Sequence, residues 1–220
     1  MKGNNIGKAA IFDLDGTLLD SMGVWDHVDD VSLNSRGIAV PEDYAQAVSH
    51  MQFREIADYT IARFNLSDDP QDLMDEWNAL AREAYATIVE VKPHAVEYLA
   101  SLKASGAKLA VATTLPPQLR DPAMDHVGIA QFFDEICSTD DVQFVGKDQP
   151  DVYLHAASLL NIEPHHCTVF EDILPGLQAA QSVGMKAWAM HDDSSDALWP
   201  QICEVADGVL FDFSNAPLVL

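Results

Sequence analysis

Short apolar runs recur along the chain, and each ends in polar or glycine residues. Runs bounded by turn-forming residues are typical of strands that are buried on both faces of a sheet. They cover residues 9–12, 108–113, 168–170, 187–190 and 209–211. Each run is shorter than an ordinary helix, so the pattern predicts buried strands.

Helical periodicity separates several of these runs. Apolar residues recur on one face between His94 and Ser105, and Gly106 follows as a stop signal. Residues 151–160 and 176–183 show further helical segments. Strands that alternate with helices favour a parallel, doubly wound sheet, so the predicted fold class is α/β with a Rossmann-like core.

Residues 21–92 interrupt this alternation. They contain no convincing strand pattern, but they do show helical periodicity, as in residues 53–64. We therefore predict a core domain of residues 1–20 and 93–220, with a small all-helical cap domain of residues 21–92 inserted after the first strand. Both connections to the insert would be adjacent, which is the geometry of a hinged lid.

The charge balance restricts the possible partners. The 220 residues include 12 basic and 35 acidic side chains, which gives a formal net charge of −23. Such a chain repels nucleic acids and anionic lipids at long range, so we expect neither nucleic acid nor membrane as a partner. No apolar run approaches the ~18 residues that a membrane-spanning helix needs. An anionic substrate would require a cation in its site.

The cysteines indicate the compartment. Cys137, Cys167 and Cys203 are odd in number and widely spaced. They fit neither a disulfide framework nor a zinc motif, and the amino-terminal residues lack the apolar segment of a signal peptide. We therefore expect a cytoplasmic protein.

Two carboxylates follow the first predicted strand. Asp13 and Asp15 are two positions apart, so on extended backbone they point roughly the same way, and Gly16 permits a tight turn. Such a pair could hold a divalent cation, and one carboxylate could attack phosphorus. The alternative is an Asx turn with an incidental second aspartate.

Two further strand ends carry polar side chains. Thr113 and Thr114 could hold phosphate oxygens, or could simply form a turn or a helix cap. Glu171 and Asp172 follow another apolar strand, where adjacent acids need a pairing cation or a metal unless the loop is solvated. Because ligands of such sheets bind beyond the carboxyl ends of the strands, we take all of these as candidate site residues.

Lys147 is distinguished by its surroundings. Residues 121–220 contain only one other lysine or arginine, Lys186. A lysine beside Gly146 and just before a predicted helix is a candidate anion ligand, whereas alone it would be taken for a surface side chain.

Taken together, these elements resemble the haloacid dehalogenase superfamily of phosphotransferases. The four family motifs have counterparts at residues 13–17, at Thr113, at Lys147 in Gly-Lys-x-x-Pro-Asp, and at residues 171–172. The resemblance covers nearly the whole chain. The position of the insert matches the helical cap of the subgroup that contains beta-phosphoglucomutase and many sugar-phosphate phosphatases.

The resemblance implies roles for these residues. Asp13 would attack phosphorus and form an aspartyl phosphate, and Asp15 would act first as acid and then as base. Mg²⁺ would be bound by Asp172, by the Asp13 carboxylate and by the main-chain carbonyl of Asp15, with Glu171 close by. Phosphate oxygens would be held by Thr113, Thr114 and Lys147.

The predicted function is therefore Mg²⁺-dependent hydrolysis of a small phosphorylated metabolite, such as a sugar phosphate. A phosphosugar mutase of the beta-phosphoglucomutase type is the alternative, although Trp25 stands where those enzymes carry a cap-linker histidine. Arg54 is a candidate for gripping substrate.

Two other classes are also considered. A receiver-type signalling domain shares the parallel sheet, the acidic metal site and a lysine, but the insert and Asp15 argue against it. A catalytically idle scaffold conflicts with the complete set of carboxylates and the lysine.

Overall fold

The computed structural model describes residues 4–48 and 51–220. The chain divides into two compact units, one formed by residues 1–22 and 89–220 and the other by residues 23–88. The unit boundaries lie close to the predicted domain boundaries, 20/21 and 92/93. Each unit is described by itself.

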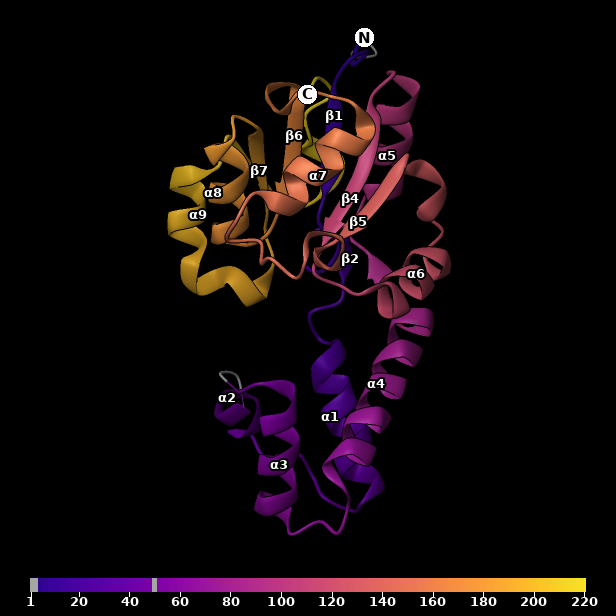
Figure 1. Ribbon diagram of the computed structural model, residues 1–220, viewed down its shortest axis with the longest axis vertical. Coiled ribbons are helices and arrows are strands. Elements are labelled where there is room, and N and C mark those ends of the chain that lie inside the picture. The colour runs from indigo at the N-terminus through magenta and orange to yellow at the C-terminus, as the bar shows by residue number, and fades with distance from the viewer. Residues whose placement is uncertain (1–3, 49–50) are drawn as a thin grey trace. The chain divides into compact units, whose positions relative to one another are not determined.

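The first unit is built on a six-stranded parallel sheet in the order β5-β4-β1-β6-β7-β8 (Figure 1). The strands are β1 (Ala9–Phe12), β4 (Lys108–Thr113), β5 (Glu135–Ser138), β6 (Cys167–Glu171), β7 (Lys186–Met190) and β8 (Gly208–Leu210). The order reverses direction at β1, as expected for a doubly wound sheet. The predicted α/β fold class is therefore confirmed.

One strand of this sheet was not predicted. Strand β5 holds only Ile136 and Cys137 as apolar residues, and Glu135 and Ser138 flank them. Among the described strands its one partner is β4, so it is an edge strand of the sheet. An edge strand needs less apolar character than a central one, so its signal in the sequence is weak.

Helices connect the strands of this sheet. They are α5 (Ala95–Ala104), α6 (Pro117–His126), α7 (Asp151–Leu160), α8 (Leu174–Ser182) and α9 (Trp199–Val205). The sequence pattern did not predict α6 either, because Pro122 lies inside it and it begins with Pro117 and Gln118.

The core lies on both faces of the sheet. On one face α7 and α8 pack against the central strands in a continuous cluster of buried apolar residues. On the other face Phe12 stacks on Phe170 with ring centroids 4.6 Å apart, and Tyr98 and Phe213 close the group. The burial of Phe12 and Phe170 fixes the ends of β1 and β6, where the candidate site residues begin.

A short antiparallel ribbon joins the two ends of the insert. Strand β2 (Leu19–Asp20) pairs with β3 (Glu90–Val91), with Leu19 opposite Val91. The pattern of residues 21–92 predicts no strand, so β3 corrects that expectation. Two residues per strand are too few to give a periodic pattern.

In the part that the structure describes, the regular elements of the second unit are all helices. Its helices are α1 (Val24–Ser35), α2 (Tyr44–Val48), α3 (Phe53–Phe64) and α4 (Pro70–Thr87). Asp69 caps α4 by accepting a hydrogen bond from the Gln71 N–H at 2.8 Å, and Pro70 occupies the first helical position. Helices α1 and α3 both pack against α4.

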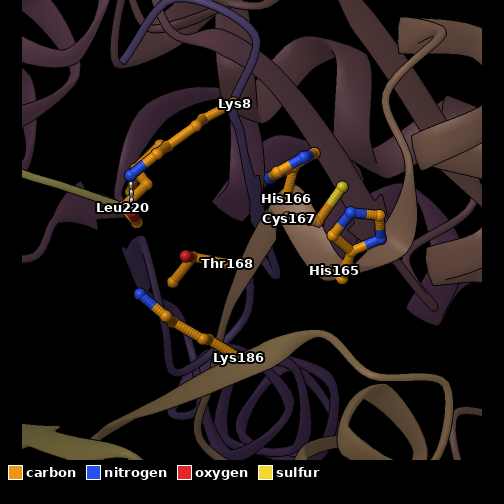
Figure 2. Close-up of a pocket in the computed structure, with 7 residues that line it drawn as sticks. All are labelled: Lys8, His165, His166, Cys167, Thr168, Lys186 and Leu220. Atoms are coloured by element: carbon orange, nitrogen blue, oxygen red, sulfur yellow. Dashed lines mark hydrogen bonds between the residues drawn. The ribbon is translucent and has the colours of Figure 1, made fainter. Parts of the chain in front are cut away.

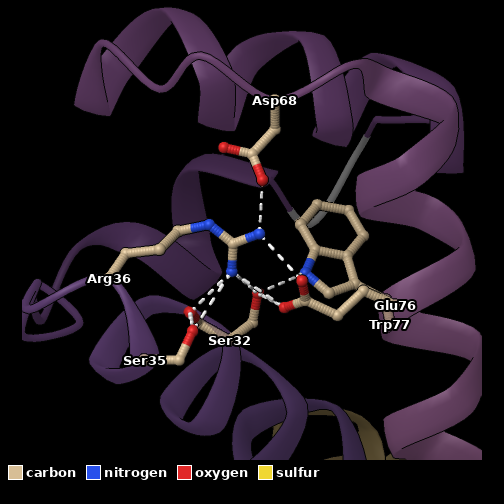
Figure 3. Close-up of polar contacts among 6 residues, drawn as sticks. All are labelled: Ser32, Ser35, Arg36, Asp68, Glu76 and Trp77. Carbon is tan, nitrogen blue, oxygen red and sulfur yellow. Dashed lines mark hydrogen bonds and ion pairs between the residues drawn. The ribbon is translucent and has the colours of Figure 1, made fainter.

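An arginine network ties the end of α1 to α4 and to the segment just before α4 (Figure 3). The Arg36 guanidinium donates to Glu76 Oε1 and Oε2, both at 2.8 Å, and to Asp68 Oδ1 at 2.5 Å. Glu76 Oε1 also accepts from the Ser32 hydroxyl, which in turn accepts from Trp77 Nε1. All donors are directed within the unit, so this network stabilises the helical insert.

Candidate active site

The first carboxylate of the site lies directly beyond β1. The Asp13 N–H donates to the Phe170 carbonyl at 3.0 Å, which continues the pairing of β1 with β6. The side chain of Asp13 is buried, and one carboxylate oxygen accepts a hydrogen bond from Lys147 Nζ. The end of β1 thus holds a buried carboxylate beside a buried lysine.

A glycine lets the loop after Asp13 approach the end of β6 closely. Gly16 has a φ of +77°, and a Cβ atom there would lie 2.5 Å from Asp172 Oδ2. The next residue, Thr17, donates its hydroxyl to Asp172 Oδ1 at 3.1 Å. Positive φ and close contact together require glycine at this position.

Glu171 accepts hydrogen bonds at both of its carboxylate oxygens. Its Oε1 accepts from Lys147 Nζ at 2.5 Å and from the Tyr153 hydroxyl at 2.8 Å. Its Oε2 accepts from the main-chain N–H groups of Asp172 and Ile173, at 3.0 and 3.2 Å. The carboxylate is therefore fixed in orientation and is fully buried.

Lys147 connects the elements of the site. It lies in the turn before α7, is buried, and pairs with both Asp13 and Glu171. Burial alone lowers the pKa of a lysine, but the two carboxylates outweigh it and raise the pKa of Lys147 above its usual value. The ammonium group is therefore charged and held in one place.

With all three carboxylates ionised, the cluster would carry uncompensated negative charge. Asp13, Glu171 and Asp172 each place a carboxylate oxygen within 4.8 Å of the others, and Lys147 supplies one positive charge. Burial raises the pKa of Asp172 to about 9, with Glu171 and Asp13 adding to the rise. Burial also raises the pKa of Asp13 to about 7; Lys147 opposes that rise and Glu171 adds to it. A hard divalent cation with oxygen ligands fits this imbalance, since it would supply the missing two charges.

Asp15 lies in the turn beyond Asp13 and is only partly buried. Its Oδ1 accepts a hydrogen bond from the Ser21 hydroxyl at 2.5 Å. Ser21 is itself buried and directly follows β2. The second aspartate is thereby oriented by the strand that leads out of the core.

The two predicted threonines differ in their surroundings. Thr113 is buried at the end of β4, and its Oγ1 accepts from the Leu115 N–H at 3.0 Å. Thr113 and Asp13 lie at the same end of the parallel strands, the carboxyl end, because Phe12 and Val111 are paired in register. Thr114 is exposed.

The sequence did not indicate the contacts that three side chains make with the predicted site residues: those of Thr17, which belongs to the first motif, and of Ser21 and Tyr153. Thr17 and Ser21 lie within a few residues of Asp15, but nothing in their pattern indicates which carboxylate they contact. Tyr153 follows the apolar pattern of α7, so its hydroxyl gave no separate signal.

A pocket of about 100 Å³ lies at the other end of the strands, where they begin (Figure 2). It includes Lys8, Thr168 and Lys186, the exposed residues His165 and His166, and none of the predicted site residues. The Lys8 ammonium donates to the main-chain oxygen of Leu220. We assign no reaction to this pocket.

No helix in the described ranges, 4–48 and 51–220, is long and apolar enough to cross a membrane.

Comparison with known proteins adds independent information. The family model of haloacid dehalogenase-like hydrolases matches residues 8–184. The phosphorylated carbohydrates phosphatase of Thermotoga maritima is 26% identical over 81% of this chain and 82% of its own length. The fructose-1-phosphate phosphatase YqaB of Escherichia coli K12 is 30% identical over 80% of this chain and 93% of its own.

A solved structure from Thermotoga maritima, provisionally described as a beta-phosphoglucomutase, superposes with a TM-score of 0.82. Its sequence is 24% identical, and the match covers 92% of this chain and 94% of that one. At this identity the likeness concerns the fold.

Proposed function

The chain belongs to the haloacid dehalogenase-like hydrolases, and from that premise we propose that it is a Mg²⁺-dependent phosphatase of a small phosphorylated metabolite. Sugar phosphates are the proposed substrate class, since several relatives are named for phosphatases of this kind. The observation that carries the proposal is the buried cluster of three carboxylates and one lysine at the carboxyl edge of the sheet.

Asp13 is the proposed nucleophile. One carboxylate oxygen forms a bond to phosphorus while the bond from phosphorus to the ester oxygen breaks, and Asp15 donates a proton to the departing oxygen. Asp15 then takes a proton from a water molecule that attacks the aspartyl phosphate. Phosphate departs and the Asp13 carboxylate is restored.

The phosphoryl group would be held by residues from separate elements. Lys147 offers a fixed positive charge, and Thr113 and Thr114 at the end of β4 are the proposed hydroxyl and main-chain ligands. Lys147 also neutralises part of the charge that would otherwise repel a phosphate dianion from Asp13.

Mg²⁺ is the proposed cofactor. The Asp13 carboxylate, the Asp15 main-chain carbonyl and the Asp172 carboxylate would hold it, with Glu171 adjoining. Bound there, the ion supplies positive charge for the transferring phosphoryl group. Asp172 is the member of the cluster that is not paired with Lys147, so it is the one left most in need of a cation.

The helical unit formed by residues 23–88 is the proposed cap, which we expect to govern access of the substrate. The free cysteines agree with a reducing compartment, and we propose the cytoplasm as the place of action.

Phosphate release from a panel of phosphorylated metabolites tests the function. We expect release with Mg²⁺, none in excess EDTA, and loss of turnover by at least about 10³-fold in Asp13→Asn with the fold retained. Asp20→Asn makes the same change on an exposed side chain and should retain activity. Full activity of Asp13→Asn, or undiminished release in EDTA, would refute the proposal.

The panel includes beta-glucose 1-phosphate together with a sugar bisphosphate primer. Conversion to the 6-phosphate isomer without release of phosphate would assign the mutase reaction instead.

A further inference from the structure

The buried phenol of Tyr153 lies beside the charged cluster, and the proposed mechanism does not use it. We propose that Tyr153 is a positioning residue, which orients Glu171 and through it holds the Lys147 ammonium against Asp13. This inference rests on the proposed phosphatase function for its effect on turnover.

The contacts form one connected chain. The Tyr153 hydroxyl donates to Glu171 Oε1 at 2.8 Å, and the same oxygen accepts from Lys147 Nζ at 2.5 Å. Lys147 Nζ also donates to Asp13. The ammonium further lies 5.9 Å from the centre of the Tyr153 ring, so the tyrosine faces both members of the Lys147–Glu171 ion pair.

The surrounding residues confine the Tyr153 phenol to this position. Tyr153 is fully buried on α7. A Cβ atom on Gly176 would lie 2.7 Å from the Tyr153 hydroxyl and 2.8 Å from the Glu171 carboxyl carbon. Helix α8 therefore contacts both partners of the hydrogen bond from one side, and only glycine leaves room for them.

The hydrogen bond matters because it constrains the Glu171 oxygen that the main chain does not hold. Its Oε2 is fixed by the main chain at Asp172 and Ile173, whereas Oε1 is fixed only by Lys147 and Tyr153 among the contacts described. Without the phenol, the Glu171–Lys147 pair would lose one of its constraints. Catalysis by preorganised charge depends on such constraints, since a fixed ammonium stabilises developing charge better than a mobile one.

The test is Tyr153→Phe, which removes one oxygen and keeps the ring. We expect kcat to fall about tenfold, with KM changed less than about twofold, because substrate binding is retained while the charged group is less well placed. Tyr98→Phe is the matched control. Tyr98 is also buried, and its hydroxyl donates at 2.8 Å, but to the main-chain oxygen of Pro217.

A second variant perturbs the same Tyr153–Glu171 contact from helix α8. In Gly176→Ala the new methyl group would press on the Tyr153 hydroxyl and on Glu171. We expect the same pattern, a lower kcat at similar KM. Unchanged kcat in Tyr153→Phe, or an equal loss in Tyr98→Phe, would overturn the inference while leaving the phosphatase function in place.

A readout without turnover separates the two proposals. In metal-free protein labelled with ¹⁵N-lysine, the buried Lys147 ammonium should give a protected NMR signal, identified by its loss in Lys147→Met. We expect Tyr153→Phe to broaden or shift that signal and Tyr98→Phe to leave it unchanged. Should the wild type release no phosphate from any substrate, the proposed function fails, and this signal still decides the positioning role. An identical signal in Tyr153→Phe and wild type would refute that role.

Discussion

At the scale of single residues, the site is defined by charge that the protein itself does not balance. Glu171 shares Lys147 with Asp13, but Asp172 receives only the Thr17 hydroxyl among the described side-chain contacts. A buried carboxylate in this position destabilises the folded protein unless a cation joins it. We therefore expect Asp172 to serve the proposed metal site while lowering the stability of the metal-free protein.

We predict opposite effects of Asp172→Asn on stability and on activity. The folded-state pKa of Asp172 is raised from its usual 3.8 to about 9, so the wild type loses stability as pH rises between these values. In EDTA the variant should be more stable than wild type by about 1–3 kcal/mol at pH 8, and the difference should shrink towards pH 4. Phosphatase activity should be lost.

Urea unfolding at both pH values measures this, with Asp20→Asn as the exposed control. Mg²⁺ should raise the unfolding midpoint of the wild type and not that of Asp172→Asn. A metal-free variant less stable than wild type at pH 8 would contradict the assignment.

At the scale of elements, the two strands that leave and re-enter the core are tied to the sheet. Lys92 directly follows β3, and its N–H donates to the Leu18 carbonyl at 2.8 Å. Its ammonium pairs at 2.6 Å with Asp192, which lies beyond β7. Both side chains are largely buried, at 12% and 6% exposure, so this ion pair links the β2–β3 ribbon to the parallel sheet.

We predict that Lys92→Met destabilises the protein by about 1–3 kcal/mol, because it leaves the buried Asp192 without its cation. Burial raises the pKa of Asp192, but hydrogen bonds from Lys92 and Ser194 outweigh it and lower the pKa overall. The stabilisation is thus present above the usual pKa of 3.8 and lost as pH falls below it, so the effect of the substitution should be smaller at pH 3 than at pH 7.

Chemical denaturation checks this against Lys103→Met. Lys103 pairs with Asp134 at 2.7 Å, but their side chains are 34% and 37% exposed, so its removal should cost less than about 1 kcal/mol. Equal losses of unfolding free energy in the two variants would show that burial adds nothing to the stabilisation by the Lys92–Asp192 pair.

At the scale of the whole molecule, charge repulsion is the dominant feature. The net charge of −23 reflects 35 acidic against 12 basic side chains, so most of the carboxylates cannot have a lysine or arginine of their own. Repulsion between exposed charges destabilises a compact chain and is screened by salt, whose Debye length falls from about 30 Å at 0.01 M to about 10 Å at 0.1 M.

We therefore predict that the melting temperature rises by several degrees between about 0.01 and 0.2 M NaCl, at constant pH and without divalent ions. Differential scanning calorimetry measures the shift. A melting temperature that falls or stays constant would mean that favourable ion pairs, such as those of Arg36, outweigh the repulsion.

The sequence by itself determined the central strands and the residues at their ends. The runs at Ala9–Phe12 and Lys108–Thr113 are apolar because both faces of these strands are covered, and that pattern is local. It also determined which ends carry chemistry, since Asp13 and Glu171 interrupt apolar runs where a core would exclude them. The edge strand β5 and the ribbon β2–β3 lacked such a pattern because they are short or half-covered.

Only the tertiary structure decided which side chain meets which. The Tyr153–Glu171 and Lys147–Asp13 contacts join residues 18 and 134 positions apart, a separation over which no periodic pattern extends. The exposure of Thr114 beside the buried Thr113 likewise follows from the turn after β4 and not from the residue type. Hydrophobic pattern places strands because burial acts on each residue separately, whereas hydrogen bonds and ion pairs depend on distances that exist only once the sheet has formed.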